Sequence, residues 1–316
     1  MMTPFFVPQE AALLRVLDEI TRTFDRSGEF IWSENFRPDQ MPVLFLGSDV
    51  VRTPWFWSVN LELPHAPLAE LEVAPGLVLQ RHQAFEIERP VTGFHVGSEI
   101  NEQICVVFDL DGPLPLVSDP EFARLVVHEL FHYYQVFISC WKTPVGYDSH
   151  ASVVPLGVDR VLGDLEVELL EQAVDADDDE FELLVTRFCE TRRHRDANQE
   201  RPRIVSQERG LEQIEGTARY VENRYAEFNG RPARLELPPE ALSDDIDWHN
   251  AGRFYRTGAR MGEILDRLGI DWRPRLQIGQ TPALIVAEVM AARSPRVVDV
   301  RTEAVIDVTA APSQTI

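Results

Sequence analysis

The sequence predicts an α+β fold in which a β-rich N-terminal part packs on a mostly helical remainder. Between residues 42 and 110, prolines and glycines separate short apolar runs, a pattern typical of strands and turns. After residue 118, apolar side chains recur every three or four positions over long segments, which indicates helices packed on a core. No linker rich in Pro, Gly or Ser divides the two parts. We therefore expect a single domain over residues 1–316, with a β-rich subregion at 1–117, a helical subregion at 118–295 and a short β or disordered tail at 296–316.

The expected elements follow these patterns in chain order. Apolar positions from Leu13 to Phe24 recur at helical spacing and predict an N-terminal helix over residues 11–24. The expected strands lie in the runs PVLFLG, WFWSVNLEL, GLVLQ, HQAFEIE and ICVVFDLD. Further helices are expected at residues 120–139, 162–174, 179–195, 205–228, 254–269 and 281–293. Residues 296–308 are expected to form one or two strands.

Capping residues set several of these boundaries. Asp119 is a good N-cap, and Pro120 suits the first helical position, where its missing N–H costs nothing. The acidic run DADDDE, residues 175–180, is typical of a loop that ends in an N-cap, because adjacent like charges favour solvent. Gly269 is expected to end the preceding helix at the C′ position.

The chain is strongly acidic, with 52 Asp and Glu against 30 Lys and Arg and a formal charge of -22. Such a surface repels phosphate backbones and anionic membranes, and we interpret the one basic run, residues 192–195, as the end of a helix. We therefore expect neither nucleic acid nor membrane as a partner. No segment approaches the roughly 20 apolar residues that span a bilayer. Because the N-terminus also lacks the pattern of a signal peptide, we expect a cytoplasmic protein.

The other residues with reactive side chains give weaker signals. Cys105, Cys140 and Cys189 are odd in number and far apart, which favours buried thiols in a reducing compartment over a disulfide framework. No phosphate-binding loop, G-x-S-x-G elbow or dinucleotide fingerprint occurs. Six histidines are expected in turns or polar surroundings: His65, His82, His95, His150, His194 and His249. The last of these is a candidate to line a cleft.

The segment LVVHELFHYY, residues 125–134, carries the first chemical motif. His128 and His132 stand four positions apart, so their side chains leave the same face of the predicted helix. This spacing lets both imidazoles bind one zinc ion at about 2 Å. Glu129 is rotated by about 100° from His128, where it is suited to take a proton from the water that the metal activates. The alternative is a pair of histidines packed at the edge of the core.

Candidates for a third ligand lie in a later helical pattern. Four glutamates share one helical face: Glu208, Glu212, Glu215 and Glu222. A solvated acidic face explains the first and the last of them equally well. We prefer Glu215 as the ligand because Gly216 and Ala218 follow it, and small residues let two helices pack closely, as a site drawn from two helices requires. Glu212 is its competitor.

Together, these motifs resemble those of the gluzincin zinc peptidases. The segments HELFH and EGTARYVE are most similar to the aminopeptidase-like branch, whose second motif is E-G-x-A-x-Y-x-E with the leading Glu as third ligand. The resemblance covers about residues 120 to 269 and implies a thermolysin-like core. It also implies one Zn²⁺ per chain, held by His128, His132 and Glu215. The 83 positions from His132 to Glu215 exceed the usual gap of that branch, so the helical pair at residues 162–200 would be an insertion.

Two further segments bear on this resemblance. The segment YRTG, residues 255–258, is similar to a Y-x-x-G segment of the branch, whose Tyr stabilises the oxyanion, so the resemblance implies this role for Tyr255. The alternative is a Tyr packed at the start of a helix. The segment GSEIN, residues 97–101, lies where the branch has an amine-anchoring G-x-M-E-N strand, but it lacks the Met-Glu order. Trimming from the amino terminus is therefore not implied.

The sequence thus predicts a zinc metallopeptidase that acts on peptide or protein substrates. Glu129 would take a proton from the attacking water and pass it to the leaving amine. Two alternatives remain open. The same residues are able to hydrolyse a non-peptide amide or ester, and a degenerate peptidase fold with structural zinc would be a binding protein. Glu129 argues against the latter, because a purely structural site has no use for a base.

Overall fold

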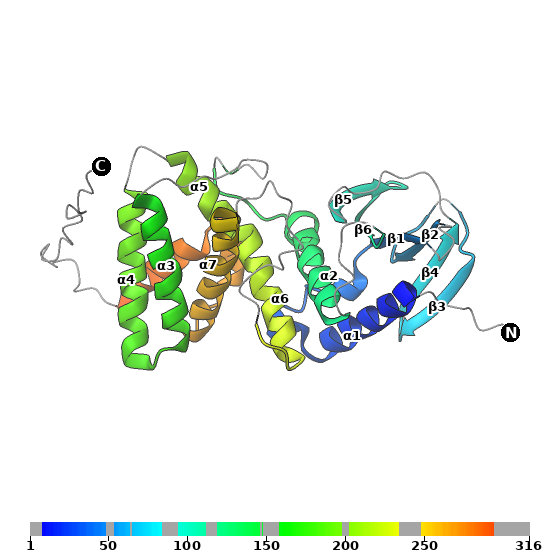
Figure 1. Ribbon diagram of the computed structural model, residues 1–316, viewed down its shortest axis with the longest axis horizontal. Helices are drawn as coiled ribbons and strands as arrows, with labels where there is room; N and C mark the ends of the chain where they lie inside the picture. The colour runs from blue at the N-terminus through cyan, green and yellow to red at the C-terminus, as the bar shows by residue number, and fades with distance from the viewer. Residues whose placement is uncertain are drawn as a thin grey trace, which may run out of the picture.

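The structure is a computed structural model that describes residues 8–48, 54–63, 65–83, 94–111, 119–145, 147, 158–197, 202–233 and 248–293. A β-sheet lies at one end of the molecule, and layers of helices extend from it towards the other end (Figure 1). The predicted α+β fold class, with a β-rich front and a mostly helical remainder, is confirmed.

The sheet has six strands in the order β3-β4-β2-β1-β6-β5. The strands are β1 (Val43–Ser48), β2 (Pro54–Val59), β3 (Ala69–Ala74), β4 (Leu77–Gln83), β5 (Phe94–Ile100) and β6 (Gln103–Asp109). The central pair β1 and β6 is parallel, and every other described pair is antiparallel. β3 and β5 are therefore the edges of this sheet.

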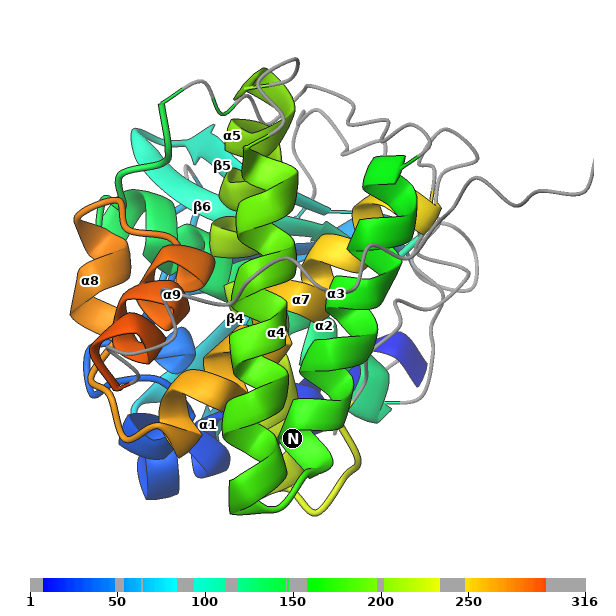
Figure 2. The same ribbon diagram turned by 90° about the vertical axis from the view of Figure 1, so that its left-hand side faces the viewer.

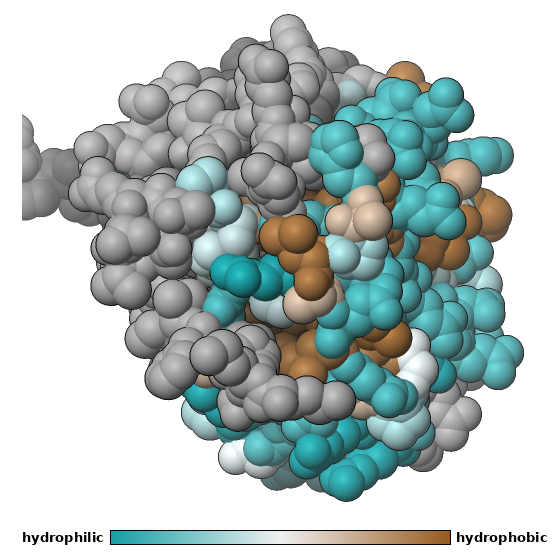
Figure 3. All heavy atoms as spheres, turned by 90° about the vertical axis from the view of Figure 1, so that its right-hand side faces the viewer, coloured by the Kyte–Doolittle hydropathy of each residue, from teal (hydrophilic) through white to brown (hydrophobic). Residues whose placement is uncertain are grey.

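The central strands are buried on both faces. In β1, Val43 and Phe45 belong to the main core, whereas Leu44 and Leu46 belong to a second cluster on the opposite face. A strand buried on both faces needs apolar side chains at every position, which is why the run PVLFLG predicts a strand correctly. The edge strands β3 and β5 were not predicted, since they mix exposed polar residues with apolar ones. Seen from the sheet end, hydrophilic side chains cover much of the described surface, and apolar ones gather near the middle of the view (Figure 3).

Two helices, α1 (Pro8–Ile31) and α2 (Asp119–Tyr133), pack on each other and against the sheet (Figure 1). Aromatic rings fix α2 in this position. The ring of Phe131 lies edge-on at 4.8 Å from Trp32 and at 5.1 Å from Phe36, a favourable arrangement for aromatic pairs. Because Phe131 stands between the two histidines of the HELFH motif and His132 follows it directly, this packing also sets the direction in which the histidines point.

The structure describes further helical elements besides α1 and α2. They are η1 (Pro38–Gln40), η2 (Tyr134–Ile138), α3 (Val158–Asp175), α4 (Asp178–Asp196), α5 (Pro202–Leu211), η3 (Glu212–Gly216), α6 (Thr217–Phe228), α7 (Trp248–Arg267), α8 (Arg273–Gln277) and α9 (Pro282–Arg293). Helix α6 packs between α2 and α7, and α7 packs on α3, which pairs with α4. Figure 2 shows α3 and α4 side by side across the helical end. No helix in the described ranges has both the length and the apolar content needed to cross a membrane.

The predicted helices are confirmed, and their differences from the structure are informative. The N-terminal helix extends beyond residues 11–24 at both ends. The pattern at 205–228 is divided, because the π-helical turn η3 separates α5 from α6, and the pattern at 120–139 ends in a second π-helical turn, η2. The short elements η1 and α8 were not predicted. The strands predicted at residues 296–308 lie outside the described part of the chain.

The capping signals are largely confirmed. The side chain of Asp177 accepts a hydrogen bond of 3.1 Å from the backbone N–H of Glu180, so the acidic run caps α4 as predicted. Gly269 has a φ of 69°, the left-handed conformation in which glycine ends a helix at C′. Helix α2 begins at Asp119, but the structure does not describe the side chain of this residue, so its role as an N-cap stays a prediction.

The turn η3 and helix α7 meet backbone to backbone at two glycines. A Cβ on Gly216 would lie 2.4 Å from the Cα of Gly258, and a Cβ on Gly258 would lie 2.5 Å from the Cα of Gly216. Neither position accepts a side chain unless the backbone moves. Gly216 thus lets the backbone of η3 pack closely on α7. The sequence analysis expected this close packing against the helix that carries the two histidines, α2.

Gly258→Ala is expected to lower the free energy of unfolding by about 1–3 kcal/mol, because the added methyl group pushes η3 away from α7. Urea denaturation followed by circular dichroism measures this loss. The control is Leu183→Ala on the exposed face of α4, where the free energy should change by less than about 0.5 kcal/mol. Equal stability of the two variants would contradict the close approach of the glycines.

Candidate metal centre

The two histidines of α2 meet at the surface between α2 and η3. His128 and His132 leave the same face of the helix, and their Nε2 atoms lie 3.1 Å apart. The rings are nearly perpendicular, with their centroids 4.8 Å apart. His128 is 5% exposed, and His132 is only partly buried, so the pair opens to solvent on the His132 side.

Glu215 of η3 completes a triangle with these two rings. Its Oε2 lies 3.6 Å from Nε2 of His128 and 3.2 Å from Nε2 of His132. A tetrahedral zinc ion with bonds of about 2.0–2.1 Å holds neighbouring ligand atoms about 3.3 Å apart. The three separations of 3.1, 3.6 and 3.2 Å scatter around this value. The donor set therefore fits one zinc ion in both chemistry and spacing.

The opposite nitrogens of both rings are engaged by oxygen atoms. Nδ1 of His128 lies 3.2 Å from Oε2 of Glu222, and Nδ1 of His132 lies 2.8 Å from Oε1 of Gln135. Each Nδ1 therefore donates its proton to an oxygen, which leaves the lone pair of each Nε2 facing Glu215. Three acceptor atoms that converge in this way repel one another unless a cation lies between them.

The pKa shifts of His132 and Glu215 also indicate that the site favours a positive charge. Burial alone would lower the pKa of His132, but Glu215 and Glu129 outweigh this effect and raise its pKa to about 9. Burial alone would likewise raise the pKa of Glu215, yet the two histidines hold it well below the usual value. In the metal-free protein a proton supplies this positive charge, and a metal ion is able to replace the proton.

Gln135 acts as a fixed partner of His132. Its side-chain N–H₂ group donates to the carbonyl of Ile214 at 3.0 Å and to Oγ1 of Thr217 at 2.9 Å. Thr217 donates its own proton to the carbonyl of Gln213, so its oxygen is free to accept. These two bonds fix which side of the amide faces His132, and that side is the oxygen. Sequence analysis missed Gln135, although its position one turn after His132 on the same helix is a usable signal.

Glu222 supports His128 in the same way. It is 5% exposed and pairs with the buried Arg219, whose Nη1 donates to Oε1 of Glu222 at 2.8 Å. Burial would raise the pKa of Glu222, but Arg219 and His128 more than offset this and lower it. The solvated acidic face that the sequence allowed for Glu222 is therefore wrong. It is also wrong for Glu208, which is 2% exposed and pairs with Arg195 and Arg253.

Glu129 lies next to the two histidines. It is 4% exposed, and one of its carboxylate oxygens lies within 4.8 Å of a ring nitrogen of His128 and of His132. Glu215, with an oxygen at 3.6 and 3.2 Å from the two Nε2 atoms, matches the tetrahedral spacing and stays the preferred candidate for the third ligand. Burial raises the pKa of Glu129 above its usual value, although the histidines act to lower it. A carboxylate of raised pKa beside a metal site is suited to act as a general base.

Tyr255 of α7 lies at the same site. Its ring stacks on that of His128, with the centroids 6.0 Å apart, and the guanidinium carbon of Arg219 lies over the Tyr255 ring at 5.6 Å from its centroid. Burial, and then the nearby Glu215 carboxylate, raise the pKa of Tyr255 well above its usual value, so the hydroxyl keeps its proton. Tyr255 lies in the second turn of α7 and not at a helix start, because α7 begins at Trp248.

Glu212, the competitor for the third ligand, points elsewhere. Arg192 donates to both of its oxygens, at 2.7 and 2.8 Å, and Thr257 donates at 2.7 Å. The π-helical turn explains why helical spacing could not choose between the two glutamates. An α-helix would place Glu212 and Glu215 on one face, whereas the wider turn of η3 directs them to different neighbours. Arg192 and Arg195 are themselves buried, so the basic run is more than an exposed end of a helix.

The other histidines whose side chains the structure describes lie outside α2 and η3. His82 is buried in β4 and not in a turn, with Nε2 at 3.0 Å from Oγ of Ser58. His95 is exposed on β5, and His194 is exposed on α4. His65 is exposed, as predicted. His150 and the side chain of His249 lie outside the description, so the expectation that His249 lines a cleft stays a prediction.

The three cysteines and the GSEIN segment also lie outside the cluster of His128, His132 and Glu215. All three cysteines are free, but only Cys105 is buried as predicted, since Cys189 is half-buried and Cys140 is exposed. Residues 97–100 of the GSEIN segment belong to the edge strand β5, which contacts α2. Gly97 has a φ of 94° where the pairing of β5 with β6 shifts, and the ring of Phe137 from η2 would lie 3.0 Å from a Cβ at this position.

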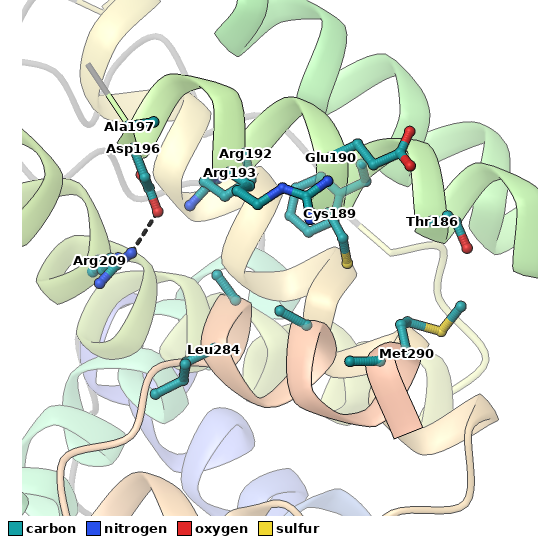
Figure 4. Close-up of a pocket in the computed structure, with 14 residues that line it drawn as sticks. Thr186, Cys189, Glu190, Arg192, Arg193, Asp196, Ala197, Arg209, Leu284 and Met290 are labelled. Atoms are coloured by element: carbon teal, nitrogen blue, oxygen red, sulfur yellow. Dashed lines mark hydrogen bonds and ion pairs between the residues drawn. The ribbon is translucent and has the colours of Figure 1, made fainter. Parts of the chain in front are cut away.

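A pocket of about 690 Å³ lies between α4 and α9, apart from the metal centre (Figure 4). Helix α9 contributes an apolar side that includes Leu284 and Met290, and α4 contributes Arg192 and Arg193. Arg209 and Asp196 form an ion pair at one end. None of the predicted site residues lines this pocket, so we attach no chemistry to it.

Comparisons of the chain with protein-family models, with curated proteins and with solved structures gave no match. The resemblance to gluzincins therefore rests on the sequence motifs alone. The interpretation of the site rests on its geometry, in which three ligand atoms from two separate elements converge.

Glu215→Ala is expected to abolish stoichiometric zinc binding, because two histidines alone leave the ion with too few protein ligands. Competition with a chromophoric chelator measures the zinc dissociation constant. The control is Glu227→Ala on the exposed end of α6, which should bind zinc as the wild type does. Tight zinc binding by Glu215→Ala would show that another residue is the third ligand.

Gln135→Met is expected to raise the zinc dissociation constant by about 10- to 100-fold, since it removes the acceptor that orients His132. The same chelator assay reports the change. A matched control is Gln172→Met on α3, where the amide only bonds Glu168 at the surface. If both variants bind zinc equally well, the amide does not support the metal centre.

Proposed function

We propose that the protein is a zinc-dependent hydrolase and that its substrates are peptides. The observation that carries this proposal is the convergence of His128, His132 and Glu215 at tetrahedral ligand spacing, with both Nδ1 atoms already engaged. Zinc prefers such nitrogen and oxygen ligands, and a site with three protein ligands keeps a fourth position for water or substrate. A closed structural site would have no such position.

The residues of the chain divide the chemistry among them. When bound, zinc would supply a Lewis acid that polarises the scissile carbonyl and lowers the pKa of a water molecule. Glu129 would take the proton of the attacking water and return it to the leaving amine. Tyr255 keeps its proton, so its hydroxyl would donate a hydrogen bond to the developing oxyanion.

Peptides are the proposed substrates because the motif set resembles that of gluzincin peptidases. The buried, raised-pKa Glu129 supports an enzyme over a binding protein, since a structural site does not need a base. We also propose a cytoplasmic location, because three cysteines that form no disulfide suit a reducing compartment.

Glu129→Gln is expected to lower kcat for peptide cleavage by at least about 10²-fold while zinc stays bound, because the amide cannot take a proton. A fluorogenic peptide library measures turnover, and the chelator assay confirms zinc binding in the same preparation. The control is Glu121→Gln, near the start of the same helix, which should keep wild-type turnover.

The results of this experiment also separate the alternatives. Full activity of Glu129→Gln would contradict the proposed mechanism. A wild-type protein that cleaves only esters or non-peptide amides would keep the metal chemistry and replace the substrate class. A wild-type protein that binds zinc and cleaves none of these substrates would be a binding protein.

A further inference from the structure

The helical pair α3 and α4 contributes to a buried group of charged residues next to η3. Six side chains from five elements form this group, which we call the ion cluster: Glu166, Arg192, Arg195, Glu208, Glu212 and Arg253. Each is 7% exposed or less. Three carboxylates face three guanidinium groups, so the cluster is formally neutral.

Arg192 is the member that joins the cluster to the metal centre. Its Nε donates to Glu166 at 3.0 Å, and its Nη1 and Nη2 donate to the two oxygens of Glu212 at 2.8 and 2.7 Å. This is the two-pronged geometry in which arginine holds a carboxylate in one orientation. Arg195 makes its hydrogen bonds to Glu166 and Glu208 instead, and neither of these lies on η3.

Glu212 is the first residue of the π-helical turn, and Glu215 lies three residues later in the same turn. The turn is held at both ends. Arg192 and Thr257 hold the carboxylate of Glu212, and the contact with Gly258 holds the backbone of Gly216. If the turn relaxed to a regular α-helix, Glu212 and Glu215 would lie on one face of that helix. With Glu212 held by Arg192 and Thr257, Glu215 would then no longer face the histidines.

The energetics of buried charges also suggest that the ion cluster orients a side chain and adds little stability. Burying an ion pair costs about as much free energy as its attraction returns, and apolar residues of similar size often stabilise a fold equally well. A cluster of this size is therefore a poor means of stabilising the helices. It is a good means of fixing one side chain in one orientation, which a ligand of a metal ion requires.

We propose that Arg192 is a positioning residue of the metal centre, which acts through Glu212 to keep η3 in its π-helical form and Glu215 directed at the histidines. This inference rests on the proposed function, because it assumes that the three residues bind zinc. It gives the helical pair α3 and α4 a role in the site, although neither helix touches the histidines in the described contacts. In this role, α4 carries the guanidinium group of Arg192, which fixes the direction of Glu215 through Glu212.

The test compares Arg192→Lys with Arg195→Lys in the full-length chain. Both positions lie on α4, both are buried in the ion cluster, and both variants keep a positive charge but lose a guanidinium group that bonds two carboxylates of the cluster. Of these two arginines, only Arg192 bonds Glu212. We expect Arg192→Lys to raise the zinc dissociation constant by about 10- to 100-fold, whereas Arg195→Lys should keep the wild-type value.

A second readout distinguishes positioning from general stability. Cobalt(II) substituted for zinc gives visible absorption bands that report the geometry of its ligands, and these bands should change in Arg192→Lys alone. Equal zinc affinity of Arg192→Lys and wild type would overturn the proposal. Equal losses in the two lysine variants would also overturn it, because the effect would then belong to the whole cluster.

A second pair of variants covers a failure of Arg192→Lys to fold, which circular dichroism would reveal. Glu212→Gln should weaken zinc binding, and Glu208→Gln, which alters a carboxylate that bonds no residue of η3, should not. The reverse order would overturn the proposal. A wild-type protein that takes up no metal would overturn the proposed function itself. A wild-type protein that binds zinc, but no more tightly than Arg192→Lys, would overturn only the role of Arg192.

Discussion

The metal centre depends on one π-helical turn, Glu212–Gly216, wedged between α2 and α7. Its first residue is bonded to Arg192 and Thr257, its fourth residue faces the two histidines, and its last residue touches the backbone of α7 at Gly258. The turn inserts an extra residue into what would otherwise be one helix from α5 to α6, and such insertions are frequent at functional sites. Without it, Glu212 and Glu215 would point to the same side. Glu212 could then not bond Arg192 while Glu215 faces the histidines.

The second constraint is the balance of charge around the histidines. Glu129, Glu215 and Glu222 surround two rings whose Nδ1 protons are already donated, and Arg219 compensates only Glu222. The site therefore attracts positive charge, which explains the raised pKa of His132 in the metal-free protein. The interior of the protein thus holds two kinds of buried charge. The ion cluster is neutral within itself, whereas the metal centre is left with an excess of acceptors for a cation.

The sequence predicts those parts of the structure that local spacing determines. The four-residue interval between His128 and His132 places both on one face of a helix, and the continuous apolar run of β1 marks a strand buried on both faces. Partners distant in sequence leave no such signal. Nothing local shows that Glu222 turns back to a histidine 94 positions earlier, or that Arg192 reaches Glu212 instead of solvent. The π-helical turn is also invisible to a helical period, because its residues have ordinary helical propensities. These elements are decided by tertiary contacts.

The account stands or falls on whether the wild-type chain binds one metal ion at these three residues. The most direct measurement is the metal content per chain, by elemental analysis of protein purified without added metal or chelator. We predict close to one zinc ion per chain. A protein that contains no metal and takes none up when zinc is added would contradict the account, and would make His128 and His132 packing residues with a shared proton.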